Sequence, residues 1–289
     1  MKQYLKLIRI KHWLKNFLVF LPLFFNGSIL NITLLIQNTI AFLVFCISSS
    51  IVYIINDICD LEKDKNHPIN KDRPLVSGKI TVGEALFVLT MFIVILTVGI
   101  IYLYLETANI FIVLIPLGYI LINILYSKGL KNVAIIDVLI LVIGFVLRVV
   151  FGAISVNVVT STYLYLMIIF GSYYLSFGKR RGEIIKNGDK SRLVLSKYSK
   201  AFLDKNMYVA YGLSIVSYTL WCVDPEVTLR IGHNYLFLTV LFLMTILQLY
   251  SLDIEKDSFA DPVDIILSDK LLILTGIAYI IVMALLIYL

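Results

Sequence analysis

The sequence is poor in charge, cysteine and histidine. Only 15% of its 289 residues are Asp, Glu, Lys or Arg, and it has three cysteines and three histidines. A soluble domain needs far more charge on its surface, so this composition excludes a water-soluble protein. Cys46, Cys59 and Cys222 are scattered and odd in number, which argues against a disulfide framework or a cysteine metal site. We interpret them as packing residues.

Sequence features of several enzyme classes are also missing. His12, His67 and His233 are scattered, so none of them is a credible catalytic base. There is no glycine-rich phosphate loop, no low-complexity tail and no clear internal repeat. Nothing in the sequence indicates nucleic acid as a partner. Any chemistry is therefore left to polar residues at the ends of apolar segments.

Long apolar runs dominate what is present. Hydrophobic residues make up 60% of the chain, and the mean hydropathy is +0.93. Several runs reach the roughly 20 residues that a helix needs to cross a bilayer. We predict an all-α polytopic membrane protein, a single domain over residues 1–289, with nine membrane-spanning helices. Their expected ranges are 14–31, 34–56, 81–104, 108–126, 133–155, 160–177, 203–222, 234–252 and 271–289.

The N-terminal segment is basic and amphipathic. Leu5, Ile8 and Trp13 are interleaved with lysine and arginine, a pattern typical of a helix that lies at the membrane interface. No A-x-A-like cleavage site follows the apolar stretch that comes next. We therefore predict an interfacial helix at about 2–13 and a first span that is retained.

Lysine and arginine fall almost entirely on one side of this arrangement. Of the 25 basic residues, only Arg148 and Arg230 lie outside the N-terminal segment and the loops after spans 2, 4, 6 and 8. By the positive-inside rule these loops face the cytoplasm. We expect a protein of the cell membrane whose site is at the cytoplasmic end of the helix bundle.

The stretch 51–80 becomes dense in charge directly after a membrane-length apolar run. Asn56, Asp57, Asp60 and Asp64 follow the order N-D-x-x-D-x-x-x-D. On a helix the three aspartates share one stripe, where they repel one another unless a cation lies between them. Oxygen ligands suit Mg²⁺, which uses one or two carboxylates and completes its shell with water and phosphate. The alternative is a solvated helix end.

A second polar cluster lies at 173–183, where span 6 ends and the second large loop begins. Lys179, Arg180 and Arg181 are consecutive, and such cations suit phosphate groups. Two glycines flank the cluster and are expected to let the backbone turn. Glu183 among the cations indicates an ordered network. An anchor at the lipid headgroups explains the same cluster, so both interpretations stay open.

Span 5 contains two charges within an apolar run. Asp137 and Arg148 share a helix face but lie about 16 Å apart along the axis, so they cannot pair with each other. Asp137 is near the cytoplasmic end and is a candidate for the site. Arg148 is deeper and needs a partner inside the bundle. That partner is either another helix or an anionic ligand.

Other polar residues near the cytoplasmic face also have two interpretations. Lys15 at the start of span 1, and Tyr126, Lys128 and Lys131 before span 5, either contact a lipid phosphate or anchor the interface. The loop at 253–270 carries aspartates four residues apart. A second metal site is conceivable there, but a solvated loop explains the same residues.

The N-D-x-x-D-x-x-x-D motif after a second span resembles that of the UbiA superfamily of intramembrane prenyltransferases. The similarity covers nearly the whole chain, although this motif does not specify a substrate. Aromatic prenyltransferases of the superfamily have a second aspartate-rich motif after span 6, where this chain has YYLSFGKRRGE. In this difference the chain resembles the decaprenyl-phosphate phosphoribosyltransferase branch of the superfamily. The segments HWLKN, HPINKDRPLVSG at 67–78 and DPVDIILSDK at 261–270 resemble the same branch.

The resemblance implies a UbiA-like bundle of nine helices whose cytoplasmic loops cap the site. It implies Mg²⁺-dependent transfer of phosphoribose from phosphoribosyl pyrophosphate to a polyprenyl phosphate, whose anionic phosphate needs no strong general base. Asn56, Asp57, Asp60 and Asp64 are the implied metal ligands, and the three aspartates are the implied catalytic residues. The residues expected to bind substrate are Lys15, Tyr53, Arg73, Tyr126, Lys128, Lys131, Arg148, Tyr174, Lys179, Arg180, Arg181 and Glu183.

Two alternatives use the same features. A prenyltransferase that moves a prenyl group from its diphosphate to an aromatic or other acceptor shares the fold, the metal and the first motif. A non-enzymatic transporter of an anionic lipid suits Arg148 and the basic cytoplasmic face, but it predicts discontinuous spans in matching halves, and no such pair is evident. The sequence does not indicate the oligomeric state.

Overall fold

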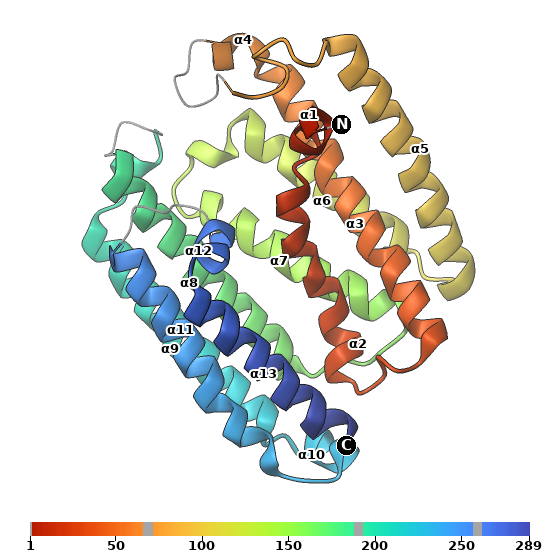
Figure 1. Cartoon of the computed structure of the whole chain (residues 1–289), viewed down its shortest axis with the longest axis vertical. Helices are drawn as coiled ribbons and strands as arrows, with labels where there is room; N and C mark the ends of the chain where they lie inside the picture. Colours follow the sequence, from red (N-terminus) through yellow and green to blue (C-terminus); the bar gives the residue numbers. More distant parts are fainter. Residues whose placement is uncertain (1, 66–71, 188–192, 257–261) are drawn as a thin grey trace. The chain divides into compact units, whose positions relative to one another are not determined.

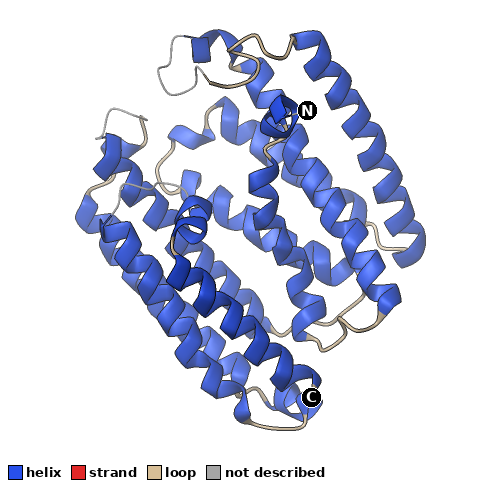
Figure 2. Cartoon of the chain, viewed as in Figure 1, coloured by secondary structure: helices blue, strands red, loops and turns tan. Residues whose placement is uncertain are grey.

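The structure is a computed structural model that describes residues 2–65, 72–187, 193–256 and 262–289 (Figure 1). Helices joined by short links make up nearly all of these ranges, and no strand occurs within them (Figure 2). The all-α prediction is therefore confirmed for the described part of the chain.

The helices follow one another with few residues between them. In chain order they are α1 (Lys2–Leu7), η1 (Ile10–Phe20), α2 (Leu21–Phe25), α3 (Ile32–Cys59), α4 (Leu61–Lys65), α5 (Val82–Thr107), α6 (Phe111–Lys128), η2 (Leu130–Asn132), α7 (Ile136–Ser155), α8 (Thr162–Asn187), η4 (Leu195–Lys197), α9 (Lys200–Cys222), α10 (Pro225–Ile231), η5 (Tyr235–Thr239), α11 (Val240–Lys256), α12 (Pro262–Ser268) and α13 (Lys270–Tyr288).

Polar side chains fix where several of the long helices begin. Asn31 and Asp269 each accept hydrogen bonds from two backbone N–H groups at the starts of α3 and α13, and Ser199 accepts one at the start of α9. Thr81 and Glu84 form a reciprocal capping box at the start of α5. Such caps satisfy backbone donors that a helix leaves unpaired at its first turn.

Each of the nine predicted spans coincides with helical structure. Within the described ranges, six helical stretches are long and apolar enough to cross a membrane: α3, α5, α6, α7, α13 and the continuous stretch of η5 and α11. The chain is thus a multi-pass membrane protein, and the count of nine spans stays a prediction. The first predicted span consists of η1, which is a 3₁₀ helix, followed by α2.

Two predicted helix boundaries are wrong. The N-terminal helix expected at about 2–13 ends at Leu7, and Arg9 adopts a left-handed backbone before η1 begins. Span 6 was expected to end at 177 with a turn in the backbone at the flanking glycines. Instead, α8 runs without a break to Asn187.

The chain forms two compact units. Unit 1 comprises residues 1–24, 28–129 and 147–158, and unit 2 comprises residues 25–27, 130–146 and 159–289. α7 contributes its first half to unit 2 and its second half to unit 1. The single domain over 1–289 stays a prediction.

In unit 1, α3 is the central helix. It packs against α5, α6 and η1, and α3 and α5 lie side by side in Figure 1. Phe45 of α3 contacts the rings of Tyr119 in α6 and Phe151 in α7 within the buried core. Trp13 of η1 donates to Ser50 of α3 at 3.1 Å, so η1 is held along this helix by a polar contact.

In unit 2, α8 and α9 form the most extensive helix pair, and α11 packs against α9 and α13. Tyr174, Tyr250 and Leu203 are among the buried residues of its core. The core of each unit is apolar, so the buried polar groups within it need partners, and these partners define the candidate site.

Candidate functional site

The aspartate motif lies at the end of α3 and in the short helix α4. Helical hydrogen bonding continues past Cys59, because the backbone N–H groups of Asp60 and Asp64 donate to the carbonyls of Asn56 and Asp60, both at 2.9 Å. Asp57 and Asp64 are 2% and 6% exposed, whereas Asn56 and Asp60 are half-buried. The motif is helical, as its spacing predicts.

Two guanidinium groups contact the buried carboxylates. Arg73 Nη1 donates to Asp57 Oδ1 at 3.2 Å and to Asp64 Oδ2 at 2.5 Å. Arg9 Nη2 donates to the same oxygen of Asp57 at 2.7 Å. Carboxylates this deeply buried need such partners, because an unpaired buried charge is strongly destabilising. Asp57 and Asp64 thus converge on one cationic nitrogen.

Tyr53 lies one turn before the motif and faces Arg9. The guanidinium carbon of Arg9 lies 4.4 Å from the centre of the Tyr53 ring, a cation–π distance, and the ring of His12 lies 5.5 Å from it. Arg9 is absent from the predicted site residues. In sequence it is one of several cations in a basic segment, and nothing local distinguishes it from its neighbours.

The donor set of the motif suits a hard divalent cation. Asp57, Asp60 and Asp64 with Asn56 offer only oxygen ligands, which Mg²⁺ prefers. The convergence of two carboxylates on Arg73 Nη1 marks a position where positive charge is stabilised. Within the described ranges, no three Asp, Glu, His or Cys side chains lie close enough together to hold a metal ion. The residues therefore fit Mg²⁺ in their chemistry, with guanidinium groups now contacting two of the carboxylates.

Arg148, also in unit 1, connects several helices. Its Nε donates to Asn16 of η1 at 2.7 Å, and its Nη2 donates to the hydroxyl of Tyr119 in α6 at 3.1 Å. Its guanidinium also lies over the rings of Tyr119 and Phe45. Asn16 in turn donates to Ser49 of α3 at 3.3 Å. These contacts favour the inter-helix interpretation of Arg148 over an anionic ligand.

In unit 2, Asp137 is bound by groups far away in the sequence. Arg180 Nε donates to Asp137 Oδ2 at 2.6 Å, and Arg180 Nη1 donates to Glu183 at 2.7 Å. The hydroxyl of Tyr198 donates to Asp137 Oδ1 at 2.6 Å and accepts from the backbone N–H of Ile135. Burial, and then the hydrogen bond to Asp137, raises the pKa of Tyr198, so this tyrosine stays a donor. Asp137 and Arg180 are fully buried.

Two further predicted residues of unit 2 are also used inside the protein. Arg181 Nε donates to Asp204 at 2.6 Å, and its Nη1 donates to the carbonyl of Ile254. The fully buried hydroxyl of Tyr174 contacts the carbonyl of Leu247 in α11. Arg180, Arg181, Tyr174 and Glu183 are thus buried and bonded within unit 2, whereas Lys179 is half-buried. Their roles in binding substrate stay predictions.

The remaining predicted residues lie near helix ends. Lys15 is half-buried in η1, Tyr126 and Lys128 end α6, and Lys131 is in η2. The structure places Tyr126 and Lys128 in unit 1 and Lys131 in unit 2. Most of the aspartates considered for a second metal site lie at 257–261, outside the described residues, as does much of the HPINKDRPLVSG stretch.

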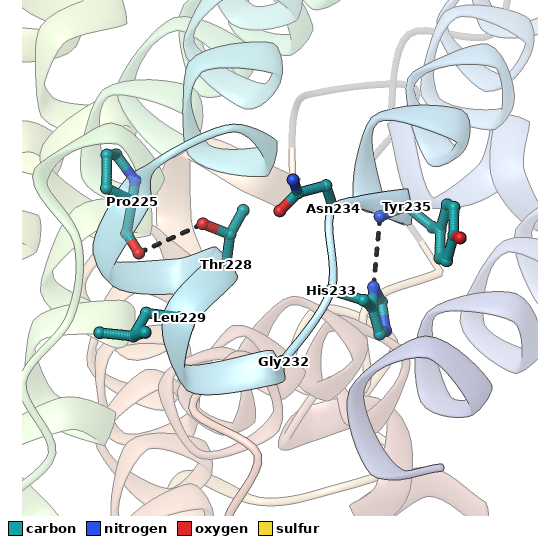
Figure 3. A pocket seen from close by; sticks show the side chains of 7 residues that line it. All are labelled: Pro225, Thr228, Leu229, Gly232, His233, Asn234 and Tyr235. Carbon is teal, nitrogen blue, oxygen red and sulfur yellow. Dashed lines mark hydrogen bonds between the residues drawn. The ribbon is translucent and has the colours of Figure 1, made fainter.

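A pocket of about 700 Å³ lies in unit 2 around α10 and η5, and none of the residues that line it is a predicted site residue (Figure 3). His233 and Thr228 are among the residues that line it. The Nδ1 atom of His233 accepts from the backbone N–H of Tyr235, and its Nε2 contacts the carbonyl of Leu286. Both ring nitrogens thus have partners within the protein. Among the described residues that line the pocket there is no Asp, Glu, Lys or Arg.

The fold and the site define a helical, multi-pass membrane protein with a polar centre at the end of a membrane-length helix. A profile of the UbiA prenyltransferase family matches residues 18–262. The chain therefore belongs to the UbiA prenyltransferase family, and it is a transferase.

Relatives from three organisms are similar over nearly the whole chain. The decaprenyl-phosphate phosphoribosyltransferase of Corynebacterium glutamicum is 30% identical over 98% of this chain and 86% of its own length. Proteins of the same name in Mycolicibacterium smegmatis and Mycobacterium tuberculosis are 29% and 27% identical and cover 96% and 95% of this chain, with 89% and 91% of their own lengths aligned.

Solved structures share the fold at lower identity. A UbiA homologue from Archaeoglobus fulgidus, bound to DMAPP and Mg²⁺, superposes with a TM-score of 0.68 at 18% identity, over 99% of both chains. A digeranylgeranylglyceryl phosphate synthase gives a TM-score of 0.62 at 19% identity, over 98% of this chain and 97% of that one. These similarities identify a UbiA fold.

Proposed function

We propose that this protein transfers 5-phosphoribose from phosphoribosyl pyrophosphate to a polyprenyl phosphate at the cytoplasmic face of the cell membrane. An oxygen of the lipid phosphate forms a bond to C1 of the ribose. The bond between C1 and the diphosphate breaks, and diphosphate leaves. The lipid phosphate is already an anion, so no basic side chain has to remove a proton from it.

One observation carries the proposal on the structural side. Two buried carboxylates, Asp57 and Asp64, converge on a single cationic nitrogen at the end of α3. At this position the carboxylates can bind a divalent cation, and the cation can in turn bind the oxygens of a diphosphate. The similarity to three phosphoribosyltransferases over at least 95% of the chain supports the choice of donor and acceptor.

Asn56, Asp57, Asp60 and Asp64 would hold Mg²⁺, which when bound stabilises the negative charge of the leaving diphosphate. Arg73 is placed beside these carboxylates, within reach of phosphate oxygens that approach them. The fork of its guanidinium can bind two phosphate oxygens at once. Tyr53 offers a ring face at the border of the same site, where a sugar can pack.

A second candidate is prenyl transfer from a prenyl diphosphate to another acceptor. The specific observation in its favour is the shared fold with the Archaeoglobus fulgidus homologue, which has been determined with DMAPP and with GPP, each together with Mg²⁺. Its donor would use the same aspartates, so the site in unit 1 does not by itself separate the two reactions.

Competing substrates distinguish these reactions. Purified protein in lipid nanodiscs would be incubated with Mg²⁺, decaprenyl phosphate and phosphoribosyl pyrophosphate labelled in the ribose. We expect label in the lipid extract and one diphosphate released per labelled lipid. Parallel reactions would contain labelled geranyl diphosphate and an aromatic acceptor. Turnover of the prenyl diphosphate, with no ribose label in the lipid, would reject the proposal in favour of the second candidate.

A further inference from the structure

We propose that Arg9 binds a phosphate group of the donor. Until a divalent cation binds at Asp57, Arg9 pairs with this carboxylate. This inference rests on the proposed function, because it assumes a donor that brings both a metal and phosphate groups. Arg9 lies between α1 and η1 and is not among the residues that the motif indicates. Its position, its partners and the charge balance of the site each support the role.

The backbone of Arg9 has an unusual conformation. Its φ of 52° and ψ of 52° lie in the left-handed region, which residues with a β-carbon seldom occupy. Such conformations persist only where surrounding contacts hold them, and they concentrate at functional sites. Here the conformation breaks the N-terminal helix after Leu7. Arg9 can therefore reach Asp57, 48 residues away in the sequence.

Two arginines compete for one oxygen of Asp57. Arg9 Nη2 and Arg73 Nη1 both donate to Asp57 Oδ1, at 2.7 and 3.2 Å. A divalent cation bound by Asp57 needs the lone pairs of this carboxylate and also repels the two guanidinium groups. We therefore expect at least one of the two arginines to move away from Asp57 when the cation binds.

Of the two arginines, Arg9 is the one that we expect to leave Asp57. In the described part of the chain, Arg73 pairs with Asp64 as well as with Asp57, whereas Arg9 pairs with no carboxylate other than Asp57. A second carboxylate therefore holds Arg73 at the motif, whereas the carboxylate that holds Arg9 is the one that the cation takes. The side chains of Arg9 and Arg73 are 26% and 30% exposed, against 3% for that of Asp57, so exposure allows either guanidinium to move and the second carboxylate partner of Arg73 makes the difference.

The released guanidinium does not have to travel far. It already lies 4.4 Å from the Tyr53 ring, and this cation–π contact is compatible with new hydrogen bonds in the plane of the guanidinium. A phosphate that arrives with the cation replaces the carboxylate as its acceptor. Arg9 would thus oppose binding of the metal alone and favour binding of the metal together with the donor.

The test measures two affinities that should change in opposite directions. In Arg9→Gln, Mn²⁺ binding without donor, measured by electron paramagnetic resonance, should become tighter by about tenfold, because one competing charge–charge hydrogen bond is lost. Binding of phosphoribosyl pyrophosphate in the presence of Mn²⁺, measured by calorimetry, should weaken by about tenfold for the same reason. Neither readout depends on turnover.

Lys65→Gln is the matched control. It removes a nearby positive charge from an exposed pair with Glu62 and should change neither affinity. Arg9→Gly removes the same side chain but suits a left-handed backbone, so it should reproduce both changes even if Arg9→Gln folds poorly. Arg9→Lys keeps the charge and loses the fork, so it should weaken donor binding with little change in Mn²⁺ affinity.

The outcomes separate the inference from the proposed function. Unchanged affinities in both Arg9→Gln and Arg9→Gly, or weaker binding of Mn²⁺ and donor alike, would overturn the role of Arg9. Failure of the unmodified protein to bind phosphoribosyl pyrophosphate would instead reject the proposed donor. In that case the Mn²⁺ measurement still decides whether Arg9 competes with the metal, and geranyl diphosphate replaces the donor in the second measurement.

Discussion

At the residue scale, neighbouring cations of this chain have different surroundings. Lys179 and Arg180 are adjacent on α8, yet Arg180 is completely buried between Asp137 and Glu183 while Lys179 is half-buried. A buried guanidinium between two carboxylates holds helices together, since each carboxylate would otherwise lie unpaired in an apolar core. A half-buried lysine is better placed to meet a ligand.

This difference predicts opposite effects for two substitutions. Arg180→Gln leaves two buried carboxylates without their cation, so it should cost about 3–5 kcal/mol of stability and lower the melting temperature in detergent. Lys179→Gln should leave the melting temperature unchanged and raise KM for phosphoribosyl pyrophosphate by about tenfold. Equal melting temperatures for the two variants would contradict a structural role for Arg180.

Asp60 provides a cleaner test of the metal site than Asp57. Asp57 neutralises two arginines, so its removal disturbs folding and catalysis together, whereas Asp60 is half-buried at the end of α3. Asp60→Asn should lower kcat by about 100-fold or more, through lost charge stabilisation of the leaving group, with an unchanged melting temperature. Diphosphate release is the measurement. Glu62→Gln, an exposed carboxylate of α4, is the control and should retain normal turnover.

At the scale of elements, a glycine sets how closely η1 approaches α7. A β-carbon on Gly152 would lie 2.0 Å from the carbonyl oxygen of Val19, and backbone atoms cannot move aside as a flexible side chain can. Gly152→Ala should therefore force η1 away from α7 and destabilise the protein by about 1–3 kcal/mol.

Gly118, in the interior of α6, is the matched comparison. A β-carbon there meets no atom within 4 Å, so Gly118→Ala should raise helix stability by about 0.5–1 kcal/mol. Thermal melts of both variants in the same detergent measure the difference. A Gly152→Ala protein as stable as Gly118→Ala would show that η1 and α7 are not in close contact.

Local patterns predict the long helices and the aspartate stripe well, because length, hydropathy and period are properties of a single segment. The break at Arg9 is not local, since an arginine has no preference for a left-handed backbone and is held there by Asp57. Gly178, one of the two glycines that flank the cationic cluster, also led to a wrong prediction, a turn in the backbone. A β-carbon there would lie 2.8 Å from Ile254, so this glycine allows close packing inside a continuous α8 and does not end it.

Partners that are distant in the sequence explain the rest of what sequence reasoning missed. Asp204 and Tyr198, which bind Arg181 and Asp137, carry no motif that marks them as part of a network. A run of consecutive cations suggests a phosphate site, but it does not reveal which of them already have internal carboxylates. Pairing of this kind depends on helix packing and cannot be derived from one sequence without a structure.

At the scale of the whole molecule, the distribution of charge predicts a side of the membrane for the aspartate motif. All but two of the 25 basic residues belong to the N-terminal segment and one set of loops, which the positive-inside rule predicts to be cytoplasmic. Cys46 and Cys222 are buried, as packing residues should be, whereas Cys59, directly before Asp60, is exposed, so its interpretation as a packing residue is wrong. The natural protein thus carries a single accessible thiol beside its candidate site.

Cys59 makes the orientation testable with the unmodified protein. A membrane-impermeant maleimide should label it in inside-out vesicles and not in right-side-out vesicles, because only the former present the cytoplasmic face. Cys59→Ser should abolish this labelling.

Leu229, 85% exposed on α10 between predicted spans 7 and 8, supplies a reporter for the other face. Leu229→Cys in the Cys59→Ser background should show the reverse pattern. The nine-span arrangement predicts an odd number of membrane crossings between the two thiols. Labelling of both thiols from the same side would require an even number, and the arrangement with its cytoplasmic site would have to be abandoned.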